Sequence, residues 1–338
     1  MRKHAVKALV WVIVMGTAGC VYVSGAINPF YKEREGLRET TVSGSGRDKV
    51  LLVDVSGMIT GLEGERSLGL VTEESMVARL QEELLRARDD KRVQALVLRI
   101  NSPGGEVTAS DTIYREIMRF KEETKRPVIA ALRDVATSGA YYVALAADQI
   151  LASPTTVTGS IGVIIVGLNV QGLMSKLGIR DQTVKSGLHK DILSPFRDTT
   201  AEERAIVQGV IDELHGRFIG LVAARRGGLS RADLEQLGDG RIFTASRAAE
   251  IGLVDRIAYV DEAIEAATEA AGIEQARVVM YHRPGEYRDN LYSGAGLLPA
   301  IARRTADRTE ILGVTVGLPR EAGPRFMYLW VPGVAASP

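Results

Sequence analysis

Three short segments of this 338-residue chain carry residue types that could do chemistry. Residues 102–105 read Ser-Pro-Gly-Gly, and glycines in a turn can point two backbone N–H groups at one oxygen, as an oxyanion hole requires. Residues 136–142 place Ser138 among small residues, where a hydroxyl could be exposed at the start of a helix. Residues 185–191 hold two lysines and a histidine. Read alone, these segments also fit a tight turn, a helix N-cap and an exposed charged loop.

Alternating strands and helices surround these segments. Short apolar runs predict strands at 49–55, 93–100, 127–132, 149–152 and 161–166. Helical spacing of apolar residues begins at Thr72, covers 107–124, and resumes from about Ser138 to Ala147. The alternation predicts an α/β fold with a mainly parallel sheet, and it places the first two segments at strand-to-helix junctions.

The chain becomes mostly helical after Thr199. Thr200 with Glu203 has the spacing of a capping box, and Ser230 with Asp233 indicates a second helix start. An apolar stripe with i+4 spacing follows the first cap, and a face for the core or for subunit packing explains it better than a cofactor site. A further helix is expected over 245–251.

Taken together, the segments resemble the signal peptide peptidase A family of membrane-bound bacterial serine proteases. The family pattern contains a Ser-Pro-Gly-Gly turn, a Ser-Gly-Gly-Tyr-Tyr segment, a Gly-Ser-Ile-Gly strand, and Lys-Ser-Gly leading to Lys-Asp. Matching segments lie, in this order, at 102–105, 138–142, 159–162, 185–191, 240–244 and 252–255. Their number and order make the resemblance specific over residues 49–271. Ala140 stands where the family usually has the second glycine.

The resemblance implies the α/β spiral of the Clp protease and crotonase superfamily, with a mainly parallel sheet and a helical C-terminal extension. It makes Ser138 the nucleophile and Lys190 the general base, and it makes Ser160 the hydroxyl that orients the lysine. Gly105 and Gly139 are expected to supply the two N–H groups of the oxyanion hole. A lysine base needs a pKa near ~7–8 instead of ~10.4, so such a site must be dry.

Other residues of these segments offer alternatives. Lys185 is a second candidate for the base. His189 could form a Ser-His pair, but no carboxylate partner is identifiable, which favours a position on the rim. Asp191 is expected to pair locally, and Tyr141 and Tyr142 are expected to pack instead of acting as acids.

The N-terminus has the pattern of an export or anchoring segment. Three basic residues, Arg2, Lys3 and Lys7, precede an apolar stretch over 8–27 whose 20 residues are just long enough to span a bilayer. An uncleaved anchor is the favoured interpretation. A lipoprotein signal ending at Cys20 and a cleaved secretory signal are the alternatives. The basic start predicts a body on the extracytoplasmic or periplasmic side, and the resemblance implies that the membrane is a bacterial inner (cytoplasmic) membrane.

The composition excludes several classes of protein. Lys plus Arg and Asp plus Glu both number 42, and this balance argues against nucleic-acid binding and against disorder. The single cysteine excludes an intramolecular disulfide and a multi-cysteine zinc site, and the four histidines show no metal-binding spacing. We therefore expect no metal and no organic cofactor.

The expected organisation has four parts. Residues 1–28 form the signal or anchor, 29–48 a polar linker, 49–275 the Ser-Lys peptidase domain, and 276–338 a tail without an assigned role. The expected function is hydrolysis of signal-peptide remnants or other unstructured peptides at the membrane, through an acyl-enzyme. The resemblance also implies a ring-like homo-oligomer, in which the serine and the lysine of one site can come from neighbouring subunits; the sequence leaves open whether they do so here.

Two other functions fit parts of the pattern. A crotonase-like acyl-thioester enzyme would also use two backbone N–H donors, but it needs no Ser-Lys pair and an exported protein would rarely meet coenzyme A substrates. A non-catalytic membrane scaffold would keep the fold, but it would have no reason to keep Ser138, Ser160 and Lys190 together.

Overall fold

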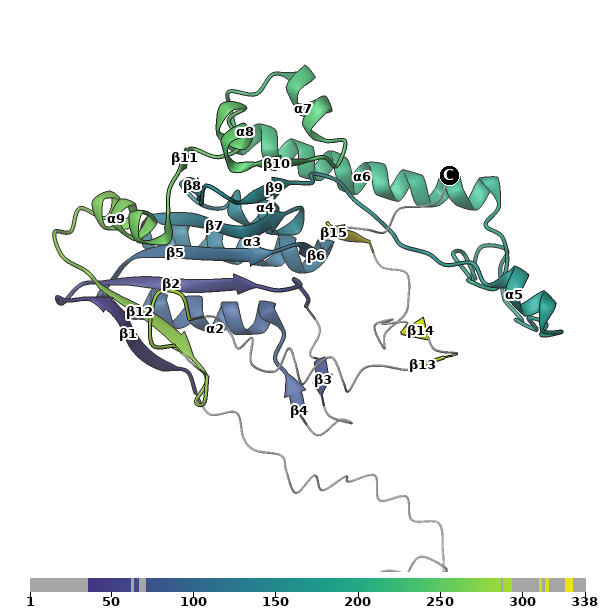
Figure 1. Cartoon of the computed structure of the whole chain (residues 1–338), viewed down its shortest axis with the longest axis horizontal. Coiled ribbons are helices and arrows are strands. Elements are labelled where there is room, and N and C mark those ends of the chain that lie inside the picture. Colours follow the sequence, from purple (N-terminus) through teal and green to yellow (C-terminus); the bar gives the residue numbers. More distant parts are fainter. Residues whose placement is uncertain are drawn as a thin grey trace, which may run out of the picture. The chain divides into compact units, whose positions relative to one another are not determined.

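The computed structural model describes most of the chain after the predicted anchor (Figure 1). The described residues are 36–61, 64–66, 71–286, 288–293, 310–311, 314–315 and 326–330. The predicted anchor over 8–27 and Cys20 lie outside them. Among the residues that the structure describes, no helix has both the length and the apolar character needed to cross a membrane.

A nine-stranded, mainly parallel sheet forms the centre of the fold, as predicted. Its main path runs β1-β12-β2-β5-β7-β8-β11, with β9 and β10 branching from β7. The strand bounds, in that order, are Arg38–Gly44, Arg277–His282, Lys49–Ser56, Val93–Ser102, Val128–Thr137, Gln149–Ala152, Arg256–Ile257, Val157–Gly159 and Ile242–Thr244. Only the β1–β12 and β9–β10 pairs are antiparallel within this sheet. The structure thus has the architecture that the strand and helix alternation predicts.

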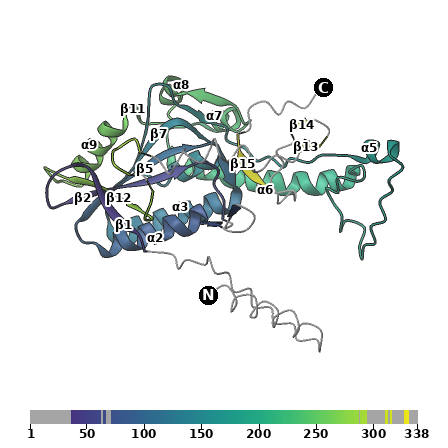
Figure 2. The same cartoon turned by 60° about the horizontal axis from the view of Figure 1, so that its bottom comes forward.

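Helices cover both faces of the sheet because alternate strand residues point to opposite faces. On β2, Leu51 and Val53 belong to the core beneath α2 (Met76–Asp89), α3 (Val107–Thr124) and α4 (Gly139–Ala144). Val50 and Leu52 instead belong to the core beneath α9 (Val260–Ala270). Figure 2 shows the sheet between α9 and the α2–α3 pair.

The remaining helices extend from this body along one side (Figures 1 and 2). Their bounds are Gln171–Lys176 for α5, Ala201–Arg225 for α6, Arg231–Leu237 for α7 and Ala245–Glu250 for α8. The predicted capping boxes at Thr200 and Ser230 are both present. At 1.5 Å per residue, the 25-residue α6 is about 37 Å long. Its C-terminal half packs on the body through Phe218 and Val222, which are fully buried.

The stretch between Gly162 and Thr200, here called the arm, differs from the prediction. No strand forms over 161–166, and only Ile164 makes a β-bridge, to Met327. The arm contains α5 and several exposed apolar side chains, among them Leu168, Leu177 and Val184. An apolar run forms a strand only where a neighbouring strand pairs with it and other side chains bury it. Within this chain the arm has little of either.

Parts of the expected linker and tail belong to the folded body. β1 comes from the stretch expected to be a linker, and β12 and β15 (Met327–Leu329) come from the expected tail. β15 pairs with β6 (Gly104–Glu106) in a separate two-stranded sheet. Two further small pairs join β3 (Gly64–Arg66) to β4 (Val71–Glu73), and β13 (Glu310–Ile311) to β14 (Val314–Thr315).

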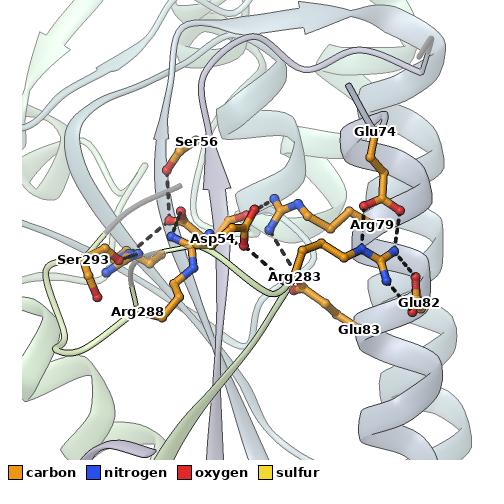
Figure 3. Close-up of polar contacts among 11 residues, drawn as sticks. Asp54, Ser56, Glu74, Arg79, Glu82, Glu83, Arg283, Arg288 and Ser293 are labelled. Carbon is orange, nitrogen blue, oxygen red and sulfur yellow. Dashed lines mark hydrogen bonds and ion pairs between the residues drawn. The ribbon is translucent and has the colours of Figure 1, made fainter. Parts of the chain in front are cut away.

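A buried ionic cluster ties the segment after β12 to the sheet (Figure 3). Asp54 on β2 accepts a hydrogen bond from Arg99 Nε at 3.0 Å, and Arg79 Nη2 donates to the Asp54 carbonyl oxygen at 2.6 Å. Arg99 Nη2 reaches the carbonyl oxygen of Ser293 at 2.6 Å, and Arg79 pairs with Glu83 at 3.0 Å. Burial alone would raise the pKa of Asp54, but Arg99, Arg79 and Arg288 together hold this pKa below its ordinary value.

Glu83 should make stability depend on pH. Burial raises its pKa from 4.5 to about 7, although Arg79 opposes the shift. Between these values the folded protein holds a proton that the unfolded chain releases, so stability falls as pH rises from about 5 to about 7.5. The contribution of Asp54 is lost only as pH falls through its lowered pKa, outside this window. Thermal melting of Glu83→Gln should therefore show a smaller fall in Tm across the window than the wild type.

Glu82→Gln is the matched control, because Glu82 lies on the same helix but is 43% exposed. The Tm of this variant should fall with pH as steeply as that of the wild type. An unchanged slope in Glu83→Gln would show that Glu83 does not carry the linkage.

Candidate active site

Ser138 lies at the turn between β7 and α4. Its backbone has φ 54° and ψ −118°, a conformation that residues with a Cβ rarely adopt and that costs about 1–3 kcal/mol. Two backbone hydrogen bonds hold it: Ser138 N donates to Gly159 O at 2.7 Å, and Tyr142 N donates to Ser138 O at 2.9 Å. The Ser138 side chain makes no capping hydrogen bond to α4, so the helix end does not consume the hydroxyl.

The backbone of the Ser-Pro-Gly-Gly turn lies close to the backbone of Gly139, the residue after Ser138. Gly104 has φ +100°, and a Cβ on it would lie 2.8 Å from Gly139 N. A Cβ on Gly139 would lie 3.2 Å from Gly105 N. Ser102 Oγ accepts the Gly104 N–H at 3.1 Å, so the turn itself uses that donor. Gly105 and Gly139 therefore provide the two neighbouring N–H groups that an oxyanion hole needs.

Ser160 lies next to the nucleophile turn. It follows β9, which pairs with the end of β7 so that Thr137 faces Gly159. Gly159 O accepts the Ser138 N–H, and Ser160 is therefore one residue from a direct backbone contact with Ser138. Ser160 is 7% exposed and has φ 51°. The structure thus brings together four of the five predicted site residues, since Ser138, Gly139, Gly105 and Ser160 share one end of the sheet.

Lys190, the fifth, lies on the arm and is exposed. Among the described residues, its side chain makes no hydrogen bond or ion pair. Its loop is fixed by Arg197, which contacts Asp191 at 2.6 Å and Glu203, in the first turn of α6, at 2.5 Å. The part of α6 that reaches the Ser138 region, at Leu214, lies about 16 Å further along the helix. Within one chain, the structure does not bring Lys190 to Ser138.

The alternative residues of the arm are also remote from Ser138. Lys185 forms an ion pair with Asp191 at 2.6 Å, which occupies its ammonium group. Two partners, Arg197 first and then Lys185, lower the pKa of Asp191. His189 faces Glu202, in the first turn of α6, at 3.5 Å. These contacts agree with a local pairing role for Asp191 and a position outside the nucleophile turn for His189.

The two tyrosines after Ser138 pack in the interior. Tyr141 donates to Leu253 O at 2.7 Å, and Tyr142 donates to Asp111 at 2.6 Å. Ala140 is fully buried in the same helix without a positive φ, so its methyl group fits where the family usually has glycine. Sequence reasoning missed one neighbour, Tyr328, whose carbonyl oxygen lies 3.1 Å from where a Cβ on Gly139 would be. The apolar run over 326–331 was its only signal in the sequence.

No group of three or more histidine, cysteine, aspartate or glutamate side chains that could hold a metal ion occurs in the described part of the chain.

Comparisons with known proteins agree with this geometry. The family model of "Peptidase family S49" matches residues 120–274, and that of "Clp protease" matches residues 58–156. An Enterococcus faecium protein named signal peptide peptidase SppA is 35% identical over 259 residues, which are 77% of this chain and 74% of that protein. Protease 4 of Salmonella typhi is 33% identical over 220 residues, which are 65% of this chain and 34% of that protein.

Two solved structures share parts of the fold. A mutant of the 1510-N membrane-bound stomatin-specific protease has a TM-score of 0.42 and 17% identity, covering 65% of this chain and 85% of that one. ClpP1 of Listeria monocytogenes, also a mutant, has a TM-score of 0.40 and 19% identity, covering 63% and 94%.

The sheet and the family matches define a serine peptidase with the Clp protease and crotonase type of α/β fold, and the predicted fold class is confirmed. The chain belongs to peptidase family S49, the family of signal peptide peptidase A. Family membership favours peptide hydrolysis over the acyl-thioester and scaffold alternatives.

Gly105→Ala should remove most peptidase activity. A Cβ on Gly105 would lie 2.0 Å from Ile59 O, so the turn must move and carry its N–H group away from the reacting carbonyl. Loss of one oxyanion donor costs about 10²–10³ in kcat. Peptide turnover gives the loss of activity, and thermal melting followed by circular dichroism shows whether the variant is still folded.

Gly209→Ala on α6 is the matched control, because nothing lies within 4 Å of a Cβ at that position. It should keep wild-type activity. Full activity in a folded Gly105→Ala variant would exclude Gly105 as a donor.

Proposed function

We propose that this protein is a membrane-anchored serine endopeptidase that uses Ser138 as nucleophile and Lys190 as general base. The observation that carries the proposal is the strained backbone of Ser138, held beside the N–H groups of Gly139 and Gly105. Strain at a residue whose hydroxyl is not used for capping is typical of a catalytic position. Membership of a serine peptidase family supports the assignment.

The proposed reaction has two halves. The neutral lysine amine takes the Ser138 hydroxyl proton as the oxygen attacks the substrate carbonyl, and the N–H groups of Gly105 and Gly139 stabilise the oxyanion. The ammonium then protonates the leaving amine, and an acyl-enzyme remains on Ser138. Water, activated by the same amine, hydrolyses this ester and regenerates the serine. Ser160 orients the lysine amine from its position next to the Ser138 backbone.

The lysine is proposed to come from a neighbouring subunit of a ring-like homo-oligomer. Two features support this. Lys190 is exposed on an arm anchored about 16 Å along α6 from the Ser138 region, and the arm exposes Leu168, Leu177 and Val184 without cover from its own chain. Packing against a neighbour would bury these side chains, and it would give the lysine the dry surroundings that a base needs.

The substrates are proposed to be signal-peptide remnants or other unstructured peptides near the membrane. The basic residues Arg2, Lys3 and Lys7 before the apolar stretch support an anchor with the body on the extracytoplasmic side of a bacterial inner membrane. The name of the Enterococcus relative supports the substrate class. Mass spectrometry of the membrane-bound form tests the alternative of a lipid on Cys20.

Ser138→Ala and Lys190→Ala should each abolish hydrolysis of a fluorogenic peptide. The expected loss is about 10³-fold or more, because the nucleophile and its base act as a unit. Lys185→Ala should keep a turnover well above that of the Ser138→Ala and Lys190→Ala variants, because the Lys185 ammonium group is already paired with Asp191. Full activity in Ser138→Ala and Lys190→Ala would exclude the dyad, and loss only in Lys185→Ala would transfer the base to Lys185.

Mixing the two inactive variants tests the shared site. If Ser138 and Lys190 come from adjacent subunits of a ring, co-expressed Ser138→Ala and Lys190→Ala chains in equal amounts should form intact sites at about a quarter of positions. Activity should recover to about that fraction of wild type. No recovery in mixed oligomers would place both residues of a working site on one chain.

A further inference from the structure

Lys190 lies in a compact loop of the arm, residues 187–194, which we call the lysine loop. Backbone hydrogen bonds fold this loop: Lys190 N donates to Gly187 O at 3.2 Å, and Ser194 N donates to Asp191 O at 2.9 Å. These bonds fix the shape of the loop. They do not fix its position relative to the rest of the chain, which depends on other contacts.

The side chain of Arg197 joins the lysine loop to helix α6. On the loop side, Arg197 Nε donates to Asp191 Oδ2 at 2.8 Å and Nη2 donates to Oδ1 at 2.6 Å. On the helix side, Nη1 donates to Glu203 Oε2 at 2.8 Å and Nη2 donates to Oε1 at 2.5 Å. The guanidinium holds both carboxylates in bidentate pairs, a geometry for which a planar fork is better suited than the point charge of a lysine. We call these three residues the arginine clamp.

The helix side of the arginine clamp is fixed to the body. Glu203 is 2% exposed and lies in the first turn of α6, where its carboxylate also accepts the N–H of Thr200 at 3.0 Å. Arg197 and this N–H lower the pKa of Glu203 to about 2, so the carboxylate stays charged at neutral pH. From there α6 continues without a break to Phe218, which is buried in the core of the body. The arginine clamp thus fixes the lysine loop relative to the body through one helix.

The arginine clamp also leaves Lys190 available for another subunit. Asp191 is the carboxylate next to Lys190 along the chain, but it is occupied by Arg197 and by Lys185, whose Nζ lies at 2.6 Å. Among the residues that the structure describes, the exposed Lys190 side chain pairs with no carboxylate. An ammonium group held by the carboxylate of its own loop could not reach into a neighbouring subunit.

We propose that Arg197 is a positioning residue for the peptidase reaction: its clamp holds the lysine loop in place and presents Lys190 of one subunit to Ser138 of the next. The proposal rests on the proposed dyad and its shared site. Arg197 acts through Lys190 and takes no part in the bond changes. A loop that pivots about its link to α6 would let the amine miss the serine, and misplacement by about 1 Å can cost roughly 100-fold in rate.

Mixed oligomers separate this role from a general effect on folding. In a mixture of Ser138→Ala and Lys190→Ala chains, a shared site takes its lysine from the first chain and its serine from the second. Arg197→Met added to the Ser138→Ala chain should lower the recovered activity about tenfold or more, because that chain supplies the lysine. The same change added to the Lys190→Ala chain is the matched control, and it should leave the recovered activity within about twofold.

The outcomes of these mixtures are distinct. A drop of equal size in both would overturn the proposal, because a folding or assembly defect does not depend on which chain carries it. No drop in either mixture would overturn it as well. A parent mixture without recovered activity would instead overturn the shared site of the proposed function, and the kinetics of uniform oligomers then decide the role of Arg197.

Uniform oligomers give a second readout. Arg197→Met should lower kcat for a fluorogenic peptide about tenfold or more with KM within about twofold, because a misplaced base slows proton transfer without weakening peptide binding. Arg197→Lys should recover part of kcat, since an ammonium group keeps the charge but cannot form both bidentate pairs. Arg247→Met, which breaks an exposed ion pair with Glu250 on α8, should leave both constants unchanged. A raised KM with unchanged kcat in Arg197→Met would contradict the proposal.

Asp191→Asn keeps the test decisive if Arg197→Met does not fold. This change weakens the loop side of the arginine clamp, and it leaves the contacts of Glu203 with Arg197 and with the cap of α6 in place. In the mixed oligomers it should lower activity only when the Ser138→Ala chain carries it. Equal activity of the two mixtures with folded chains would exclude the arginine clamp as the device that positions Lys190.

Discussion

The backbone of Ser138 is the constraint on which the site depends. A serine with φ 54° is unfavourable by itself, so neighbouring structure must hold it. The pairing of β7 with β5, β8 and β9 holds the residues before it, and the fully buried α4 holds those after it. The same turn requires glycine at 104, 105 and 139, since a Cβ at any of these positions would overlap other atoms at 2.0–2.4 Å. Ser138 and the N–H groups of Gly105 and Gly139 are therefore placed by one set of backbone contacts.

The sheet explains why these residues meet although they are far apart in sequence. β5, β7 and β9 are parallel, so their carboxyl ends lie at the same edge, where open α/β sheets commonly bind ligands. The glycine turn follows β5, Ser138 follows β7, and Ser160 follows β9. Two hydrophobic layers, one on each face, fix these three strands against one another. Most of the hydrophobic core thus serves to position three short turns.

The sequence could predict which residues follow the ends of the parallel strands. It could not predict contacts with segments far along the chain or with another subunit. Strand ends carry the first four site residues, and α3 has the predicted bounds because periodicity and turn residues mark them. Lys190 could be named from a motif but not placed, because the arm buries few side chains and its surroundings include another subunit under the proposed assembly. β15 could not be predicted, because a three-residue strand that pairs more than 200 residues away leaves only a short apolar run as a signal.

Two backbone edges, those of β6 and of Ile164, pair with β15 from either side. β6 and Ile164 both present main-chain donors and acceptors, and an unpaired group there would carry a cost once water is excluded. Only an extended segment satisfies both edges at once, which explains why these residues of the C-terminal region form a strand although the strand is only three residues long.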